Sequence, residues 1–101
     1  MKVREFREQI KSWETEGKLK SQTVEFIIDS KKYFASEVKA GVNTMSFSVT
    51  RENYQPLDLS ALQSNLKVAG GDITIQISHG TNAKDIEQLY ISDDFIEVVL
   101  A

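Results

Sequence analysis

Residues 44–50 have the sequence TMSFSVT, in which apolar and hydroxyl side chains alternate and no residue is charged. This alternation is typical of a β-strand with one face in the core and the other toward solvent. We therefore expect Met45, Phe47 and Val49 to face the core. The opposite face would carry hydroxyl groups alone, from Thr44, Ser46, Ser48 and Thr50.

Two further strands are expected before this one. The run TVEFIID at residues 23–29 is rich in β-branched and aromatic side chains, and a strand over 33–38 would place Phe34 and Val38 on one face. Turn residues at 30–32 and 41–43 separate the three strands. The first half of the chain thus predicts a β-meander.

The chain begins with a predicted amphipathic helix. Val3, Phe6, Ile10 and Trp13 follow one another at intervals of three, four and three residues, which places them on one helical face. Gly17 can adopt the left-handed conformation that ends a helix. We expect this helix to lie across the sheet, where each large side chain contributes about 1.5–3 kcal/mol by burial.

A proline-containing loop over residues 51–56 separates the two halves of the chain, because proline cannot donate to a central strand ladder. Beyond it, the spacing of Ser60 and Gln63 is that of a capping box, and leucines at helical intervals predict a helix ending near Ala69. Gly70 and Gly71 follow that helix and precede a strand, an order opposite to that of a phosphate-binding loop.

Three strands are expected in the second half, over residues 73–78, 86–91 and 95–100, with a loop from His79 to Asn82. Residues 84–89 also contain good helix formers, so a helix is the alternative there. The element order is α-β-β-β-α-β-β-β. This order predicts an α+β fold in which the N-terminal helix packs on a mostly antiparallel sheet or on two small packed sheets. With 101 residues, the chain has the length of a single domain.

Charge and composition narrow the expected partners. The formal net charge is -3, and residues 61–101 carry six acidic against two basic residues. The isoelectric point near 5.1 argues against a nucleic-acid partner, since phosphate binding requires clustered Lys and Arg. The chain has no cysteine, no apolar leader and no run long enough to cross a bilayer, so we expect a cytoplasmic protein that does not engage a membrane.

No catalytic or cofactor-binding constellation is evident. His79 is the only histidine, and its neighbour Ser78 would point to the opposite face of a strand. One histidine without cysteine leaves only carboxylates as metal ligands, and their spacing is not that of an EF-hand. The expectation is a protein that is not an enzyme and that needs neither cofactor nor metal.

The candidate site residues are therefore surface residues suited to protein contact. The acidic C-terminal part could dock a basic partner, and tyrosine is favoured at interfaces. The hydroxyl face could serve as a neutral binding surface, and the strand over 44–50 could act as an edge that accepts another strand. The residues selected for partner binding are Tyr54, Tyr90, Asp85, Glu87, Asp93 and Asp94.

Two terminal segments resemble those of short bacteriophage proteins of unknown function. Residues 3–29 contain VREFREQI, a polar linker through Gln22, and TVEFIID, and the chain closes with DIEQLYISDDFIEVVLA. The resemblance implies a small accessory factor of phage or mobile-element origin that acts by binding.

Two functions follow as hypotheses. The first is a non-enzymatic binding protein that occupies a surface of a larger protein or associates with itself. The alternative is a small-ligand or nucleotide-binding domain that uses the loops at residues 51–55 and 79–82.

Overall fold

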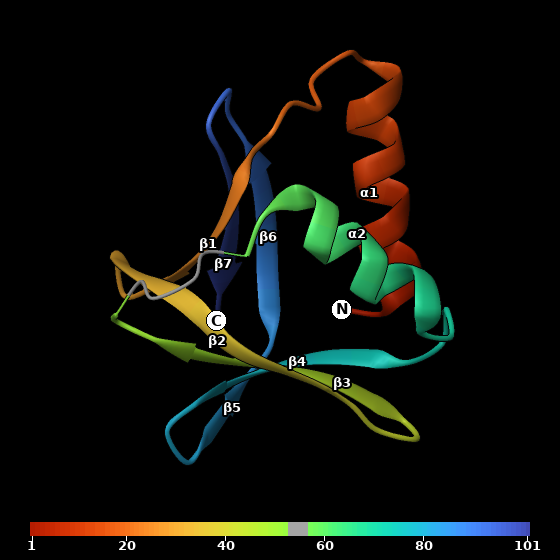
Figure 1. Cartoon of the computed structure of the whole chain (residues 1–101). Coiled ribbons are helices and arrows are strands. Elements are labelled where there is room, and N and C mark those ends of the chain that lie inside the picture. The colour runs from red at the N-terminus through yellow and green to blue at the C-terminus, as the bar shows by residue number, and fades with distance from the viewer. Residues whose placement is uncertain (53–56) are drawn as a thin grey trace.

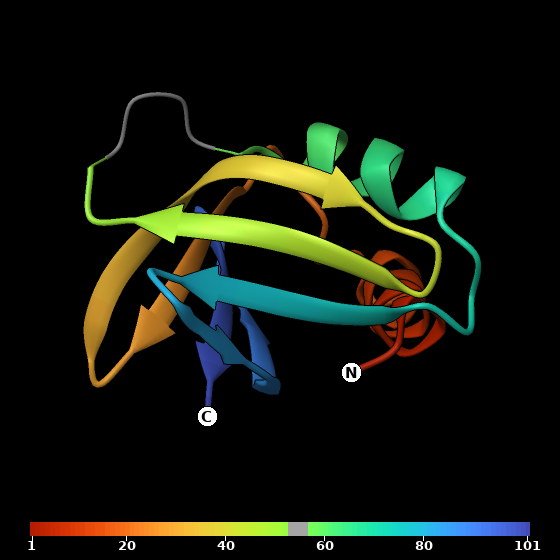
Figure 2. The same ribbon diagram turned by 90° about the horizontal axis from the view of Figure 1, so that it is seen from below.

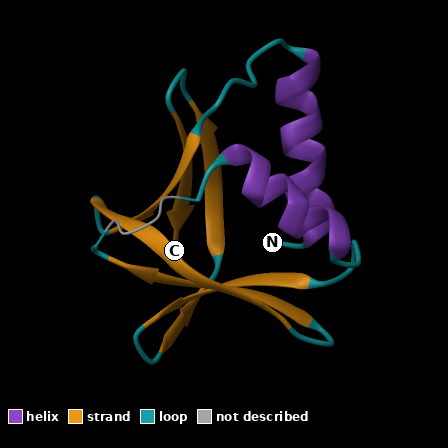
Figure 3. Ribbon diagram, in the orientation of Figure 1, coloured by secondary structure: helices purple, strands orange, loops and turns teal. Residues whose placement is uncertain are grey.

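The computed structural model describes residues 1–52 and 57–101. It contains two helices and seven strands, and the fold class is α+β as expected (Figures 1 and 3). In chain order the elements are α1 (Val3–Thr15), β1 (Thr23–Ile28), β2 (Lys31–Ala40), β3 (Thr44–Thr50), α2 (Leu59–Val68), β4 (Thr74–His79), β5 (Asn82–Lys84), β6 (Ile86–Ile91) and β7 (Phe95–Leu100).

The strands form one sheet in the order β5-β4-β3-β2-β1-β7-β6. The pairs β1–β7 and β3–β4 are parallel, and the other four pairs are antiparallel. The expected meander is present as β1, β2 and β3. The sheet bends sharply along β2, so that β3, β4 and the later part of β2 run at a steep angle to β1, β7 and β6 (Figure 2).

A bulge in β2 contributes to this bend. In β2 the register shifts between Ala35 and Glu37, and such a bulge increases strand twist and bends the strand. The bend also brings the two edges of the sheet together at one point, since Asp85 is the single residue between β5 and β6. Because β5 and β6 lie at opposite edges of the sheet, the chain crosses from one edge to the other at this residue.

Both helices lie on the same side of the strands and cover the inner face of the bent sheet (Figure 3). The apolar stripe of α1 is buried as expected, with Phe6, Ile10 and Trp13 retaining 2%, 5% and 6% of their exposure. These side chains join the inward residues of β1, β3, β4, β6 and β7 in one apolar core. Gly17 has φ 73° and follows the end of α1, also as expected.

Because of the bulge in β2, the expectation that Phe34 and Val38 share one face of that strand was wrong. Tyr33 is in the core, whereas Phe34 pairs with Thr50 on the outer face. Val38 still packs against the core. The extra residue at the bulge changes which side chains point inward, and a strict period of two could not reveal it.

Three local expectations about turns and caps were also wrong. The first hairpin turns at Asp29 and Ser30, whose φ angles of 50° and 64° match a two-residue type I′ turn. The cap of α2 is Asp58, whose carboxylate accepts a hydrogen bond from Ala61 N at 2.7 Å, and Ser60 lies inside the helix. His79 ends β4, and the short strand β5 occupies part of the expected loop.

A buried glutamine connects three segments near the end of α1. Gln22 is fully buried, and its side chain donates to Lys18 O at 2.9 Å and to Ser92 O at 3.1 Å. The same side chain accepts from Lys20 N at 2.6 Å. Its backbone oxygen accepts from Leu59 N at 2.9 Å, which links the segment to the start of α2. Gln22 therefore holds the linker, the β6–β7 hairpin and α2 together.

Neither described helix has the length and apolar character needed to span a bilayer.

Candidate functional site

The acidic candidate residues lie along β6, an edge strand of the sheet. Asp85 and Glu87 are at its start, Asp93 and Asp94 form the turn after it, and Tyr90 lies between them. The four acids are exposed, and Tyr90 retains 51% of its exposure. The structure thus spreads these residues along one strand instead of gathering them into one patch. Tyr54, the remaining candidate, lies outside the described residues.

β6 presents unpaired backbone groups along its free side. Ser92 N donates to Phe95 O at 2.8 Å, and antiparallel pairs alternate between bonded and non-bonded positions. The register from Ile91–Ile96 to Leu89–Val98 is continuous, so the N–H and C=O groups of Leu89 and Ile91 point away from β7. Over the described ranges, no other backbone group bonds to them.

The outer face beside β6 contains two pairs of an aromatic ring and a carboxylate. In the first pair, Glu25 and Phe95 hold Lys32, whose Nζ lies 3.4 Å from Glu25 Oε2 and 5.3 Å from the Phe95 ring centre. In the second pair, Tyr90 lies directly opposite Glu97 across β6 and β7. In the part of the chain that the structure describes, no cation contacts the Tyr90–Glu97 pair.

We call the surface along β6 the acidic edge. It consists of Asp85, Glu87, Tyr90, Asp93, Asp94 and Glu97. Residues 85–101 contain five acids and no Lys or Arg. Asp93 Oδ1 accepts from Lys20 Nζ at 2.9 Å, and both side chains are more than half exposed. The register shift in β6 between Ile86 and Gln88 leaves residues 88–91 as the regular part of the strand.

The hydroxyl face is more extensive than one strand. The parallel pairing of β3 and β4 sets Thr44 beside Thr74, Ser46 beside Gln76 and Ser48 beside Ser78, all half-buried. However, β3 lies between β2 and β4, so the expectation that it could accept a strand at an edge was wrong.

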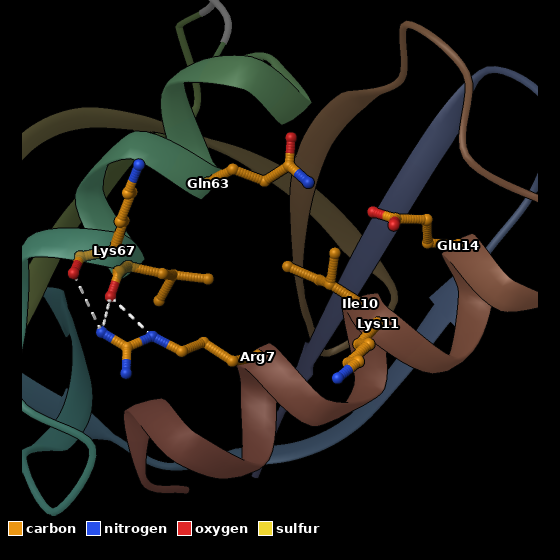
Figure 4. A pocket seen from close by; sticks show the side chains of 7 residues that line it. Arg7, Ile10, Lys11, Glu14, Gln63 and Lys67 are labelled. Carbon is orange, nitrogen blue, oxygen red and sulfur yellow. Dashed lines mark hydrogen bonds between the residues drawn. The ribbon is translucent and has the colours of Figure 1, made fainter.

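A groove lies between the two helices, which meet near the N-terminal half of α1 and diverge from there (Figures 1 and 4). Its volume is about 400 Å³. Arg7 closes the narrow end: its Nε donates to Leu66 O at 2.8 Å, and its Nη2 donates to the carbonyl oxygens of Leu66, Lys67 and Ala69. These carbonyls belong to the last turn of α2 and its cap, where no helical partner is available. The helix groove is lined by Arg7, Ile10, Lys11, Glu14, Gln63, Leu66 and Lys67.

His79 contacts an aromatic ring instead of a carboxylate. Its ring centre lies 4.7 Å from that of Tyr33 in an edge-on arrangement, and the Arg51 guanidinium lies 5.4 Å from the same Tyr33 ring. The described residues hold no group of three or more His, Asp or Glu side chains suited to a metal ion. Tyr33 is therefore contacted by one residue from each of the two loops considered for a small ligand, Arg51 and His79, and residues 53–56 lie outside the described part.

Sequence reasoning placed Glu97 near the acidic turn without selecting it, and it missed Glu25 and Lys32, because these residues come together through the pairings of β1 with β2 and with β7. It also missed the helix groove. One signal was available: Arg4, Arg7 and Lys11 are spaced by three and four residues, which places three cations in a row beside α2.

The carboxyl group of Glu16, just beyond the end of α1, is electrostatically perturbed. Glu16 has a pKa below its ordinary value because Lys18 donates a hydrogen bond to it and adds a nearby positive charge. This residue follows α1 and belongs to neither the acidic edge nor the helix groove.

No protein-family model matches the chain, and comparisons with curated proteins and with solved structures found no match either.

Proposed function

We propose that this chain is a small, non-enzymatic binding protein that recruits a basic, extended segment of another protein at the acidic edge. The partner segment would add to β6 as a further strand through the backbone groups of Leu89 and Ile91. Strand addition provides affinity through main-chain hydrogen bonds, and alternate side chains provide specificity. A lysine or arginine of the partner would then bind the Tyr90–Glu97 pair.

The observation that carries the proposal is the position of Lys32. Its ammonium group is held by a carboxylate and a ring on this same face, at 3.4 Å and 5.3 Å respectively. Tyr90 and Glu97 repeat this combination one strand closer to the free edge, without a cation of the described chain. A ring and a carboxylate together attract a cation more strongly than either does alone.

The charge of the acidic edge favours a different protein over a second copy of this chain. Two β6 strands paired edge to edge would bring the acids at both ends of the strand close to those of the other copy. Like charges facing each other across strands are destabilising. A basic segment would instead be attracted by these acids. Its association should weaken as salt screens that attraction.

Acidic residues and a bulge on an edge strand also protect a sheet against uncontrolled pairing. This protective role predicts equal exclusion of every added strand. Recruitment of a basic segment predicts selective binding. The two roles therefore differ in a measurable way.

The test uses a short synthetic peptide that alternates valine with lysine and a matched peptide with glutamate in place of lysine. We expect the lysine peptide to bind and the glutamate peptide not to bind. Glu97→Gln and Tyr90→Ala should each weaken binding severalfold, since each removes one half of the cation site. Glu5→Gln, an equal change of charge at an exposed position of α1, is the control. Equal binding of both peptides, or no binding, would refute the proposal.

The resemblance of the terminal segments to phage proteins supports an accessory role, and we propose a phage or mobile-element origin with action in the cytoplasm. The proposal would fail if genes encoding close relatives of this chain were found only outside such elements.

A further inference from the structure

Two carboxylates lie side by side on the outer face of the sheet. The parallel pairing of β1 with β7 places Glu25 directly beside Glu97. Lys32 neutralises Glu25, whose side chain is only 5% exposed, and no cation in residues 1–52 and 57–101 contacts Glu97. Like charges on neighbouring strands destabilise one another. A second cation beside Glu97 would relieve this repulsion.

The ring of Tyr90 is held in a defined position next to Glu97. Its hydroxyl donates a hydrogen bond to Gln88 Oε1, which lies two residues earlier on the same face of β6. The ring therefore leans along the strand toward Gln88, and it flanks the line from the free edge to Glu97 instead of crossing it. A side chain that reaches Glu97 from the free edge would pass along this ring.

The distance from an added strand to Glu97 is longer than the distance that Lys32 spans. Lys32 lies on β2, the strand next to β1, and its Nζ comes within 3.4 Å of Glu25 Oε2. This is slightly longer than a normal hydrogen bond. A strand added at β6 would lie two strand spacings from β7, which is about 10 Å. The longer span favours a longer side chain with several donors.

Given strand addition at β6, on which this inference rests, we infer that the partner residue opposite Tyr90 is an arginine. Arginine is longer than lysine, and its planar guanidinium can stack on the Tyr90 ring while its N–H groups bind the Glu97 carboxylate. The ammonium of lysine is a compact, strongly hydrated charge without a flat face to stack on the ring.

The partner residues on either side of this arginine should be apolar. They would point to the inner face of the sheet, beside Leu89 and Ile91, which pack against the core. The acidic edge therefore recognises an extended segment in which arginine lies between two apolar residues.

The experiment uses the valine-lysine peptide with its central lysine retained, replaced by arginine, or replaced by citrulline, the uncharged analogue of arginine. Binding is measured by isothermal titration calorimetry at one salt concentration. We expect the arginine peptide to bind about fivefold more tightly than the lysine peptide. The citrulline peptide should bind more weakly than both, because it has nearly the shape of arginine without the charge.

Variants test whether Tyr90 and Glu97 produce the preference. Tyr90→Leu retains an apolar side chain but removes the ring, and Glu97→Gln removes the carboxylate, so each should bring the affinities for the arginine and lysine peptides closer together. Gln88→Met removes the acceptor that positions the ring and should reduce the preference in part. Glu87→Gln, which removes a charge at an exposed position of the same strand, should weaken both peptides equally and leave their ratio unchanged.

Equal or tighter binding of the lysine peptide would overturn the inference and leave the proposed strand addition standing. Citrulline and arginine peptides of equal affinity would also overturn it, as would a preference for arginine that survives both Tyr90→Leu and Glu97→Gln. If none of the three peptides bound, the proposed function itself would fail, and this inference with it.

Discussion

The helix layer buries its large side chains in the core, whereas the β6–β7 hairpin exposes side chains at an edge of the sheet. α1 and α2 direct Phe6, Trp13 and Leu62 into the core, and their polar groups are joined by contacts such as that of Arg7 with the end of α2. β6 forms an edge, with an exposed Tyr90 and with Asp85 and Glu87, which make no ion pair within the described residues. The comparison predicts that stability and the proposed recognition of a partner depend on different parts of this small molecule. Substitutions should therefore affect folding in the first region and binding in the second.

The largest effect is expected for Trp13→Ala. Trp13 is 6% exposed and belongs to the core, and truncation of a buried tryptophan costs about 3–5 kcal/mol. This is a large share of the 5–15 kcal/mol typical of a folded domain. Urea unfolding followed by circular dichroism measures the loss, with exposed Glu8→Ala on the same helix as control. A midpoint near that of the wild type would show that the helix layer does not carry the stability.

Arg7→Ala should have the second largest effect. The guanidinium satisfies carbonyl oxygens of Leu66, Lys67 and Ala69, and hydrogen bonds to a charged group contribute about 1.5–3 kcal/mol. Arg7→Lys retains the charge but loses the planar fork, so its destabilisation should be intermediate. If Arg7→Lys unfolded at the same denaturant concentration as the wild type, the geometry of the contact would be irrelevant and only the charge would matter.

A smaller effect of opposite sign is expected at the first hairpin. Asp29 and Ser30 have positive φ angles, and a type I′ turn prefers Asn-Gly at these positions. The double change D29N/S30G should therefore stabilise the protein by about 0.4–1 kcal/mol. Thermal unfolding would reveal the gain, and a lower melting temperature would contradict the assignment of this turn.

The smallest effect on stability is expected at the acidic edge. Asp85 and Glu87 are exposed and make no ion pair within the described residues, so D85N/E87Q should change the unfolding free energy by less than about 0.5 kcal/mol. The same variant should weaken binding of the valine-lysine peptide and reduce its salt dependence. A marked loss of stability with unchanged peptide binding would reverse the comparison between the two regions.

Local patterns predicted most of the fold. The periodicities of α1 and β3 depend on residues close in sequence, and the expected strands at 44–50, 86–91 and 95–100 match β3, β6 and β7. β5 was missed because three residues are too few to show a period. The inward position of Tyr33 was missed because the bulge in β2 has no sequence signature of its own.

The candidate site was predicted less completely for a related reason. A tyrosine among acids can be recognised as a surface candidate from the local sequence, which is why Tyr90 and its acidic neighbours were selected. Glu97 lies opposite Tyr90 only because β6 pairs with β7, and Lys32 lies near Phe95 only because β1 pairs with β7. The helix groove likewise depends on how α1 meets α2. Contacts between segments far apart in the sequence leave no local pattern, and here they decide the chemistry of both surfaces.

The most direct test of strand addition is amide hydrogen exchange at β6 in the presence of the valine-lysine peptide. Our account predicts slower exchange at Leu89 and Ile91, whose N–H groups point to the free edge, with little change at Tyr90, whose N–H group points toward β7. Unchanged exchange at Leu89 and Ile91 under saturating peptide would contradict it.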